Sequence, residues 1–240
     1  MQLQSLSLLI TRFMKTTNKI GDLMKQQIII FDFDNTLVDS LKYWYQIINK
    51  EMFIKYGKKI DKKFPLKRKG LSNLEIAQLF VDVTGIDKSA KEINQEVNEQ
   101  MEIYYTHNIK MIKGAKDFLL SLKGQGKTLV IATATDLELA EIALKHFGIY
   151  DLFDAVFSEN SIGKRKRDKL FLETCFKKLV CSSEEVFLFE DSAVSLKSAI
   201  SLGVDCCGLV HKYNRKNITK LGIPLIKNYK NIEKKIKKNG

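Results

Sequence analysis

Acidic and hydroxyl side chains follow or end three apolar runs of the chain. They are Asp32, Asp34, Thr133, Glu190 and Asp191. Residues two apart on an extended chain point the same way, so the first two carboxylates face one side. Ligands of open α/β sheets bind at the carboxyl ends of the strands, and we therefore expect these side chains to converge there.

Four of these side chains are carboxylates, which cannot lie together as bare anions. Either their pKa values rise sharply or a cation neutralises them. Oxygen ligands select a hard cation, and Mg²⁺ held by carboxylates and by a substrate phosphate is the commonest case. Each motif alone could be a turn or a helix cap, but together they favour a magnesium-dependent site that acts on phosphate.

The convergence of these side chains depends on strands that the sequence predicts. Short apolar runs stand at 27–31, 128–133, 155–157, 186–189 and 206–210. From Gly114 onward, segments with helical spacing of apolar residues alternate with these runs. This alternation predicts an α/β fold, in which an open parallel sheet has helices on both faces.

The segment 41–112 differs because it contains only helical patterns. Two capping boxes, Ser72–Glu75 and Ser89–Glu92, open helices inside it, and Gly85 ends the first of them. An all-helical block inserted after the first strand predicts a lid over the ends of the strands.

The sequence thus divides into three parts. They are an N-terminal extension at 1–24, a core at 25–40 and 113–240, and an α-helical cap domain at 41–112.

Four segments resemble the motifs of the haloacid dehalogenase superfamily, in the same order. They are Phe31–Ser40, Leu129–Thr133, the basic segment Gly163–Asp168 and Phe189–Ser192. The resemblance covers about residues 27–238 and implies a Rossmann-like core with an inserted α-helical cap of the C1 type. Dehalogenases of that family lack an acid at the position of Asp34, so the resemblance implies the phosphatase branch.

The resemblance also implies a role for each carboxylate. Asp32 would attack phosphorus and become an aspartyl phosphate. Asp34 would protonate the leaving group and then activate water, while its backbone carbonyl binds Mg²⁺. The implied metal ligands are therefore Asp32, Asp34 and Asp191, with Glu190 beside them.

The phosphoryl oxygens would be held by Thr133 and by the amide of Ala134. A lysine would add positive charge, and that family mostly places it in a Lys-Pro pair, which this chain lacks. Counting back from the last motif favours Lys166, and Lys164 is the alternative. In the cap, Lys69 is a candidate for substrate specificity, and an ordinary solvated lysine is the alternative reading.

Other conspicuous residues are interpreted as structural. His107, His146 and His211 are scattered without metal-ligand spacing, and Trp44 fits the apolar face of the first cap helix. Asn35 stands where glycine is common in the family, and asparagine tolerates the left-handed backbone well enough to keep the turn.

Composition limits the class of protein. The chain has 240 residues, of which 45% are hydrophobic and 28% charged, and this excludes disordered and collagen-like proteins. No stretch reaches the roughly 18 apolar residues of a membrane span. Four cysteines without C-x-x-C spacing indicate reduced thiols, so we expect a cytoplasmic protein.

The net charge of +12 is concentrated near the end of the chain. Residues 214–240 contain nine basic residues and one acid. Ile232 and Ile236 lie four apart among lysines, which predicts a surface helix with a solvated basic face. No nucleic-acid-binding motif accompanies this charge, so we expect neither nucleic acid nor a membrane as a partner.

These observations predict a Mg²⁺-dependent phosphatase that hydrolyses a small phosphorylated metabolite through an aspartyl phosphate at Asp32. One alternative is a phosphosugar mutase on the same core. The other is a basic protein that binds nucleic acid on a relic fold. The sequence leaves the physiological substrate and the oligomeric state open.

Overall fold

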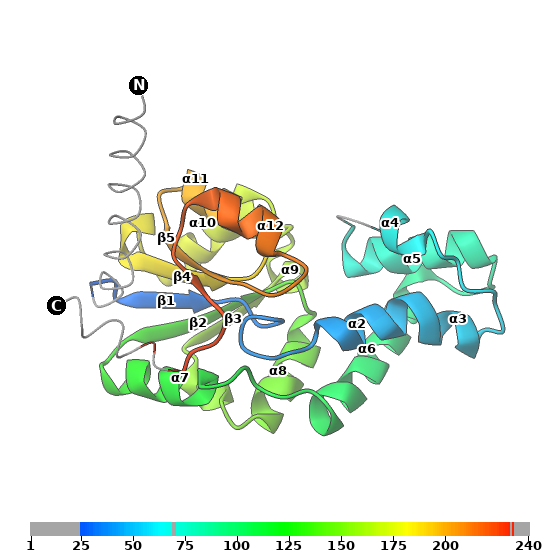
Figure 1. Cartoon of the computed structure of the whole chain (residues 1–240), viewed down its shortest axis with the longest axis horizontal. Helices are drawn as coiled ribbons and strands as arrows, with labels where there is room; N and C mark the ends of the chain where they lie inside the picture. The colour runs from blue at the N-terminus through cyan, green and yellow to red at the C-terminus, as the bar shows by residue number, and fades with distance from the viewer. Residues whose placement is uncertain (1–24, 69–70, 231, 233–240) are drawn as a thin grey trace.

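A computed structural model describes residues 25–68, 71–230 and 232 (Figure 1). The predicted N-terminal extension lies outside the described residues, as does the predicted C-terminal helix apart from Ile232, which is buried. None of the described helices has the length and apolar character needed to cross a membrane.

The centre of the molecule is a six-stranded sheet in which every neighbouring pair is parallel. In spatial order its strands are β3 (Ala155–Ser158), β2 (Thr128–Thr133), β1 (Ile28–Phe31), β4 (Val186–Glu190), β5 (Asp205–Leu209) and β6 (Leu225–Ile226). The predicted α/β fold class is confirmed. The sequence did not predict β6, because two residues are too short to show any periodicity.

Strand β1 lies between β2 and β4, and all four of its residues are buried. Phe31 pairs with Ile131 on one side and with Phe189 on the other. The rings of Phe31 and Phe189 stack with their centroids 4.9 Å apart. Pairing continues one residue further, since the amide of Asp32 donates to the carbonyl of Phe189 at 2.9 Å. The ends of the central strands are therefore held in register.

Helices cover both faces of the sheet (Figure 1). One face packs against α7 (Ala115–Gly124) and α8 (Leu137–His146), and the other against α10 (Lys169–Leu179) and α11 (Ala193–Ser201). Successive residues of β1 point to opposite faces of the sheet. Ile29 packs in the apolar cluster that includes α7 and α8, and Ile30 packs in the cluster that includes α10 and α11. This is why the strand is apolar throughout instead of alternating with polar residues.

Short elements complete the core. They are η3 (Tyr150–Leu152), α9 (Glu159–Ile162), η4 (Ser183–Glu185), α12 (Arg215–Ile218) and η5 (Thr219–Leu221).

The segment between β1 and α7 forms a block of helices at one side of the core (Figure 1). They are α2 (Leu41–Gln46), η2 (Ile47–Glu51), α3 (Met52–Lys55), α4 (Phe64–Lys67), α5 (Asn73–Thr84) and α6 (Ala90–His107). Both expected capping boxes are formed, with Ser72 bonded to Glu75 and Ser89 bonded to Glu92. Gly85 ends α5 in the left-handed conformation that glycine adopts at low cost.

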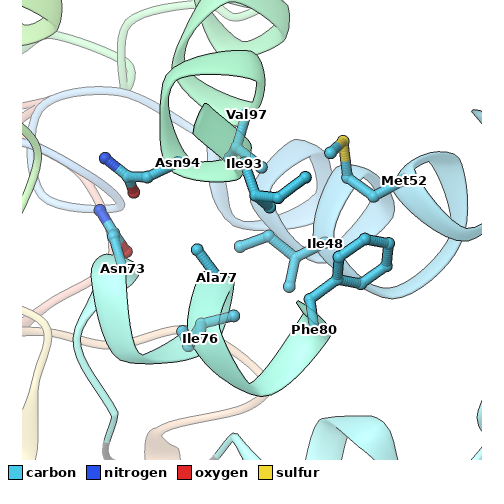
Figure 2. Close-up of a pocket in the computed structure, with 9 residues that line it drawn as sticks. All are labelled: Ile48, Met52, Asn73, Ile76, Ala77, Phe80, Ile93, Asn94 and Val97. Atoms are coloured by element: carbon cyan, nitrogen blue, oxygen red, sulfur yellow. The ribbon is translucent and has the colours of Figure 1, made fainter. Parts of the chain in front are cut away.

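The interior of this helical block is apolar and nearly filled. A cavity of about 20 Å³ remains, lined by side chains that include Met52, Phe80 and Ile93 (Figure 2). Asn73 and Asn94 stand together at one side of it, away from Met52 (Figure 2). A cavity of this size holds no more than about one water molecule, so it is a packing defect and not a ligand site.

The chain leaves the core for the helical block and returns to it at one place. The amide of Asp39 donates to the carbonyl of Lys110 at 2.9 Å, and the amide of Ile112 donates to the carbonyl of Leu37 at 2.8 Å. Val38 and Met111 form an antiparallel bridge between the same two segments. We call the outgoing segment, 35–42, and the returning segment, 110–113, the two crossings. Both lie near the end of β1 and the turn that follows it.

Candidate active site

Asp32 is the first residue after β1, and its side chain is buried. Its Oδ2 accepts a hydrogen bond from the hydroxyl of Thr36 at 2.7 Å, and its Oδ1 accepts one from Nζ of Lys166. Both carboxylate oxygens are thus oriented by the protein. The backbone pairing with β4 fixes the position from which this carboxylate projects.

A tight turn follows Asp32 and aims the second carboxylate. Asn35 has φ of +57°, in the left-handed region, and its side-chain oxygen accepts the amide hydrogen of Leu41 at 2.7 Å. The amide of Leu37 donates to the carbonyl of Phe33 at 2.8 Å. The turn expected from asparagine at this position is therefore present, and the same asparagine holds the beginning of α2.

The carboxylate of Asp34 accepts hydrogen bonds from four side chains. Ser40, Trp44 and Tyr105 donate to Oδ1, the indole at 3.1 Å and the phenol at 2.6 Å. Thr135 donates to Oδ2 at 2.5 Å. Two of these donors, Trp44 and Tyr105, belong to the helical block. The interpretation of Trp44 as a core residue is therefore incomplete, because its ring packs against the core while its N–H reaches the site.

Of the two lysines considered for the basic segment, Lys166 lies in the site. It is buried, and its Nζ contacts Asp32 and lies 2.7 Å from Oε2 of Glu190. Its amide donates to the side chain of Glu159 at 2.8 Å, which orients the loop that carries it. Lys164 is exposed instead and lines a cleft at the edge of the helical block.

Three carboxylates offer a set of metal ligands. Oxygen atoms of Asp32, Glu190 and Asp191 lie within 4.8 Å of one another. Oε1 of Glu190 accepts the amide hydrogens of Asp191 at 3.1 Å and of Ser192 at 2.8 Å, so the turn after β4 is preformed. An all-oxygen donor set with excess negative charge fits Mg²⁺. The side chain of Asp34 is not in this group.

The charges of this cluster are not balanced by its own residues. Burial and the charge of Glu190 raise the pKa of Asp32, Lys166 opposes both effects, and the resulting pKa is about 7. Burial also raises the pKa values of Glu190 and Asp191, against the hydrogen bonds that each carboxylate accepts. One ammonium group therefore faces more negative charge than it can neutralise, which is the condition that attracts a divalent cation.

Lys166 remains charged in this setting. Burial by itself would lower the pKa of its ammonium group, but the adjacent carboxylates of Asp32 and Glu190 outweigh burial and raise it. The site therefore keeps a permanent positive charge beside the Asp32 carboxylate.

Two further residues hold Asp191, and the sequence did not identify either. Nδ1 of His211 accepts the amide hydrogen of Tyr213 at 3.2 Å, so Nε2 carries the proton and donates to Asp191 at 3.0 Å. The side chain of Asn214 donates to the backbone carbonyl of Asp191 at 2.8 Å. The interpretation of His211 as an ordinary loop histidine is therefore incomplete, because its side chain also contacts Asp191.

The residues expected to hold phosphate follow β2. Thr133 is buried at the end of that strand, and its hydroxyl oxygen accepts the amide hydrogen of Thr135 at 3.1 Å. Ala134 is exposed between them. The run Thr133-Ala134-Thr135 could have indicated that a second hydroxyl belongs to the site. Lys69, the cap candidate, lies outside the described residues.

A cleft of about 440 Å³ separates the helical block from the core near these residues. The helical block contributes Asn73, Lys91 and Asn94 to the lining of the cleft. The core contributes Ala134 and Arg165. Ala134 adjoins Thr133, and Arg165 adjoins Lys166. The cleft is therefore lined by a neighbour in sequence of Lys166, which contacts Asp32.

Polar contacts join the helical block to the core around this cleft. Asp136 accepts hydrogen bonds from Asn94 at 2.9 Å and from Asn98 at 2.5 Å. Arg165 bonds to Glu75 of α5. Together with the contacts of Asp34, these interactions place the helices against the carboxyl ends of the strands.

The sequence matches the family of haloacid dehalogenase-like hydrolases over residues 29–209. Among curated proteins it is 23% identical to a phosphorylated carbohydrates phosphatase of Thermotoga maritima, over 78% of this chain and 86% of that protein. It is 22% identical to the fructose-1-phosphate phosphatase YqaB of Escherichia coli, over 74% of this chain and 93% of that protein.

A solved structure shares the fold. The crystal structure of a proposed beta-phosphoglucomutase from Thermotoga maritima superposes with a TM-score of 0.70 at 22% identity, over 88% of this chain and 99% of that one. The family match covers more than half of the sequence and includes all or most of every strand but β6. The chain therefore belongs to the haloacid dehalogenase-like hydrolases.

Proposed function

We propose that this enzyme is a Mg²⁺-dependent phosphatase that hydrolyses a small-molecule phosphomonoester through an aspartyl phosphate at Asp32. One observation carries the proposal. The buried carboxylate of Asp32 contacts a charged lysine, Lys166, and lies beside two further carboxylates, Glu190 and Asp191, that can share a cation with it. A carboxylate can attack an anionic phosphate only where such positive charge is concentrated.

In the first step, an oxygen of Asp32 forms a bond to phosphorus and the ester P–O bond breaks. The electron pair of that bond leaves with the alcohol oxygen, which takes a proton from Asp34. In the second step, Asp34 removes a proton from water as the water oxygen attacks phosphorus. The bond between phosphorus and Asp32 then breaks, and inorganic phosphate leaves.

Asp34 is suited to this part because its carboxylate is fixed in place. Ser40 and Thr135 from the core hold it together with Trp44 and Tyr105 from the helical block. The helical block thus completes the site as well as covering it, and its movement would admit the substrate and exclude water.

The phosphoryl group would be bound by Thr133, by the amide of Ala134 and by Lys166. Asp32, Asp191 and the backbone carbonyl of Asp34 would hold Mg²⁺, with Glu190 beside them. Bound there, the cation would neutralise charge that develops on the phosphoryl oxygens. His211 would keep the Asp191 carboxylate oriented.

A phosphorylated metabolite is the proposed substrate class. The cleft of about 440 Å³ has the size of a small-molecule site and presents amide and cationic side chains, beside the carboxylates of Asp136 and Glu159. Relatives named as phosphatases of phosphorylated carbohydrates and of fructose 1-phosphate support this class. Cys175 and Cys181 are free thiols, which supports a reducing compartment such as the cytoplasm.

A phosphosugar mutase is the second candidate, because a proposed beta-phosphoglucomutase has the same fold. A mutase returns the phosphoryl group to another position of the sugar, so it would convert sugar phosphates without net release of phosphate.

The test is release of inorganic phosphate from a panel of phosphate esters, with Mg²⁺ and with EDTA. We expect Mg²⁺-dependent release that Asp32→Asn abolishes and that Asp87→Asn, at an exposed position of the helical block, preserves. Conversion of a sugar phosphate without release would select the mutase. Release that persists in Asp32→Asn would refute the aspartyl-phosphate mechanism.

A further inference from the structure

A second, larger cleft lies where the chain passes between the core and the helical block. Its volume is about 530 Å³. Four segments line it: the crossing at 35–42, the return crossing at 110–113, the chain at 209–213 after β5, and residues 227–228 after β6. None of the residues assigned above to catalysis or metal binding lines this cleft.

The lining of this cleft is strongly basic. Five lysines contribute to it, and they are Lys42, Lys110, Lys113, Lys212 and Lys227. All five are exposed, and the only carboxylate among the lining residues is Asp39. Within the described part of the chain, none of the five forms an ion pair. Unpaired like charges around one concave surface attract an anion that carries several negative charges.

The other lining residues suit a ligand that also has polar and flat parts. Asn35 and Asn228 offer side-chain amides, and the ring of Tyr213 is 69% exposed. A site of several hundred Å³ is of the size that small ligands occupy and exceeds what a single phosphate fills.

We propose that this cleft binds a soluble oligophosphate, meaning a chain of two or more linked phosphate groups. The lysines would bind the phosphates, whether the chain is inorganic or belongs to a nucleotide. For a nucleotide, Tyr213 supplies a surface on which the base can stack. This site is separate from the proposed phosphatase site and does not depend on its activity.

Its position gives the bound anion a structural effect. Lys42 and Lys110 belong to the two crossings that connect the helical block, whereas Lys212 and Lys227 belong to the core. One anion that contacts all four would tether the helical block to the core. The cleft also meets the metal-ligand cluster through His211, which lines the cleft and donates to Asp191.

The binding experiment titrates inorganic tripolyphosphate into the full chain by calorimetry in buffer with EDTA. Without a cation, the carboxylates of Asp32, Glu190 and Asp191 repel polyanions, so binding under these conditions reports on the lysines. We expect one tripolyphosphate per chain. We expect the triple variant Lys42→Gln, Lys212→Gln, Lys227→Gln to bind at least tenfold more weakly.

A matched triple variant removes the same charge elsewhere. It is Lys62→Gln, Lys177→Gln, Lys197→Gln, at exposed lysines that line none of the described clefts. We expect it to bind within threefold of the unmodified chain. Equal losses in both triples, or no binding by the unmodified chain, would overturn the proposal.

Further titrations identify the source of the phosphates. Tighter binding of ATP than of tripolyphosphate, with the difference lost in Tyr213→Ala, supports the site and selects a nucleotide. Equal binding of the two supports the site and selects the inorganic chain. A single-stranded oligonucleotide that binds more tightly than either, with several chains per strand, would overturn the proposal in favour of nucleic acid.

Discussion

The phenol of Tyr105, on α6 of the helical block, donates a hydrogen bond of 2.6 Å to Oδ1 of Asp34, seven residues before that block begins. The ring is fully buried and lies against Phe33, with centroids 5.6 Å apart. Burial and the adjacent Asp34 raise the pKa of Tyr105 well above its ordinary value, so the phenol remains a donor. The helical block therefore orients the carboxylate that we propose as the acid and base.

Tyr105→Phe should lower kcat by about 10 to 100-fold, because it removes one of the donors that orient Asp34 while keeping the packed ring. The loss should be larger for alkyl phosphates than for p-nitrophenyl phosphate, whose leaving group needs less protonation. Steady-state kinetics with both substrates measures this. Tyr104→Phe is the control, since that hydroxyl bonds to Glu51 and not to the site. Equal losses for the two substrates would contradict the orienting role.

Lys166→Met should abolish phosphate release and also destabilise the protein. It leaves the buried carboxylates of Asp32 and Glu190 without their cation, and such a loss costs about 3 to 5 kcal/mol. Urea unfolding in EDTA measures the free energy of unfolding, and addition of Mg²⁺ should restore part of it. Lys164→Met, at the exposed alternative, should change stability little. If Lys164→Met abolished phosphate release and destabilised the protein while Lys166→Met did neither, the assignment of Lys166 to the site would be wrong.

The metal-free protein should lose stability as the pH rises from about 4 to about 7. Burial raises the pKa of Asp32 from 3.8 to about 7, so the folded state binds this proton more tightly than the unfolded state does. The stabilisation is complete below the unfolded pKa and is lost as the pH rises through the folded one. Thermal unfolding in EDTA measures the trend, which Asp32→Asn should flatten.

Addition of Mg²⁺ should reverse this trend. The cation competes with the protons of the carboxylate cluster, so its apparent affinity should increase between pH 6 and 8. The shift of the melting temperature with Mg²⁺ concentration gives that affinity. An affinity that does not change with pH, or that persists in Asp191→Asn, would show that Mg²⁺ binds elsewhere.

Glu96 should stabilise the helical block at neutral pH. Burial would raise the pKa of Glu96, but hydrogen bonds from Lys55, Lys88 and Tyr56 outweigh burial and lower it to about 2. Its contribution is therefore present above pH 4.5 and is lost as the pH falls toward 2. Glu96→Gln should cost about 1 kcal/mol in urea unfolding at pH 7, and less at pH 4.

The control for this prediction is Glu102→Gln, on the exposed surface of the same helix. It should leave the free energy of unfolding unchanged at both pH values. A cost of Glu96→Gln that stays constant between pH 7 and pH 3 would show that the ion pairs do not contribute.

Local patterns in the sequence predicted those parts of the fold that depend on neighbouring residues. Both capping boxes and the strand β2 have the predicted positions, because their signals lie within a few residues. The convergence of Asp32 and Asp191 also followed, since parallel strands bring their carboxyl ends to one edge.

The partners of these carboxylates could not be predicted in the same way. Tyr105 donates to a residue 71 positions earlier, and His211 contacts a residue 20 positions earlier. Neither pair has a spacing that any regular element imposes, so each depends on how the helical block and the last loop pack. The position of Lys166 depends likewise on the loop that Glu159 orients.

The bridge between Val38 and Met111 has a consequence for how this architecture can change. Because the two crossings are hydrogen-bonded side by side, the intervening segment closes on itself without displacing any strand. Lengthening such a closed segment costs only about 0.6 kcal/mol per doubling. The sheet would therefore keep Asp32 and Glu190 in place if the helical insertion were exchanged for a longer or shorter one. Asp34 would then need new donors in place of Trp44 and Tyr105.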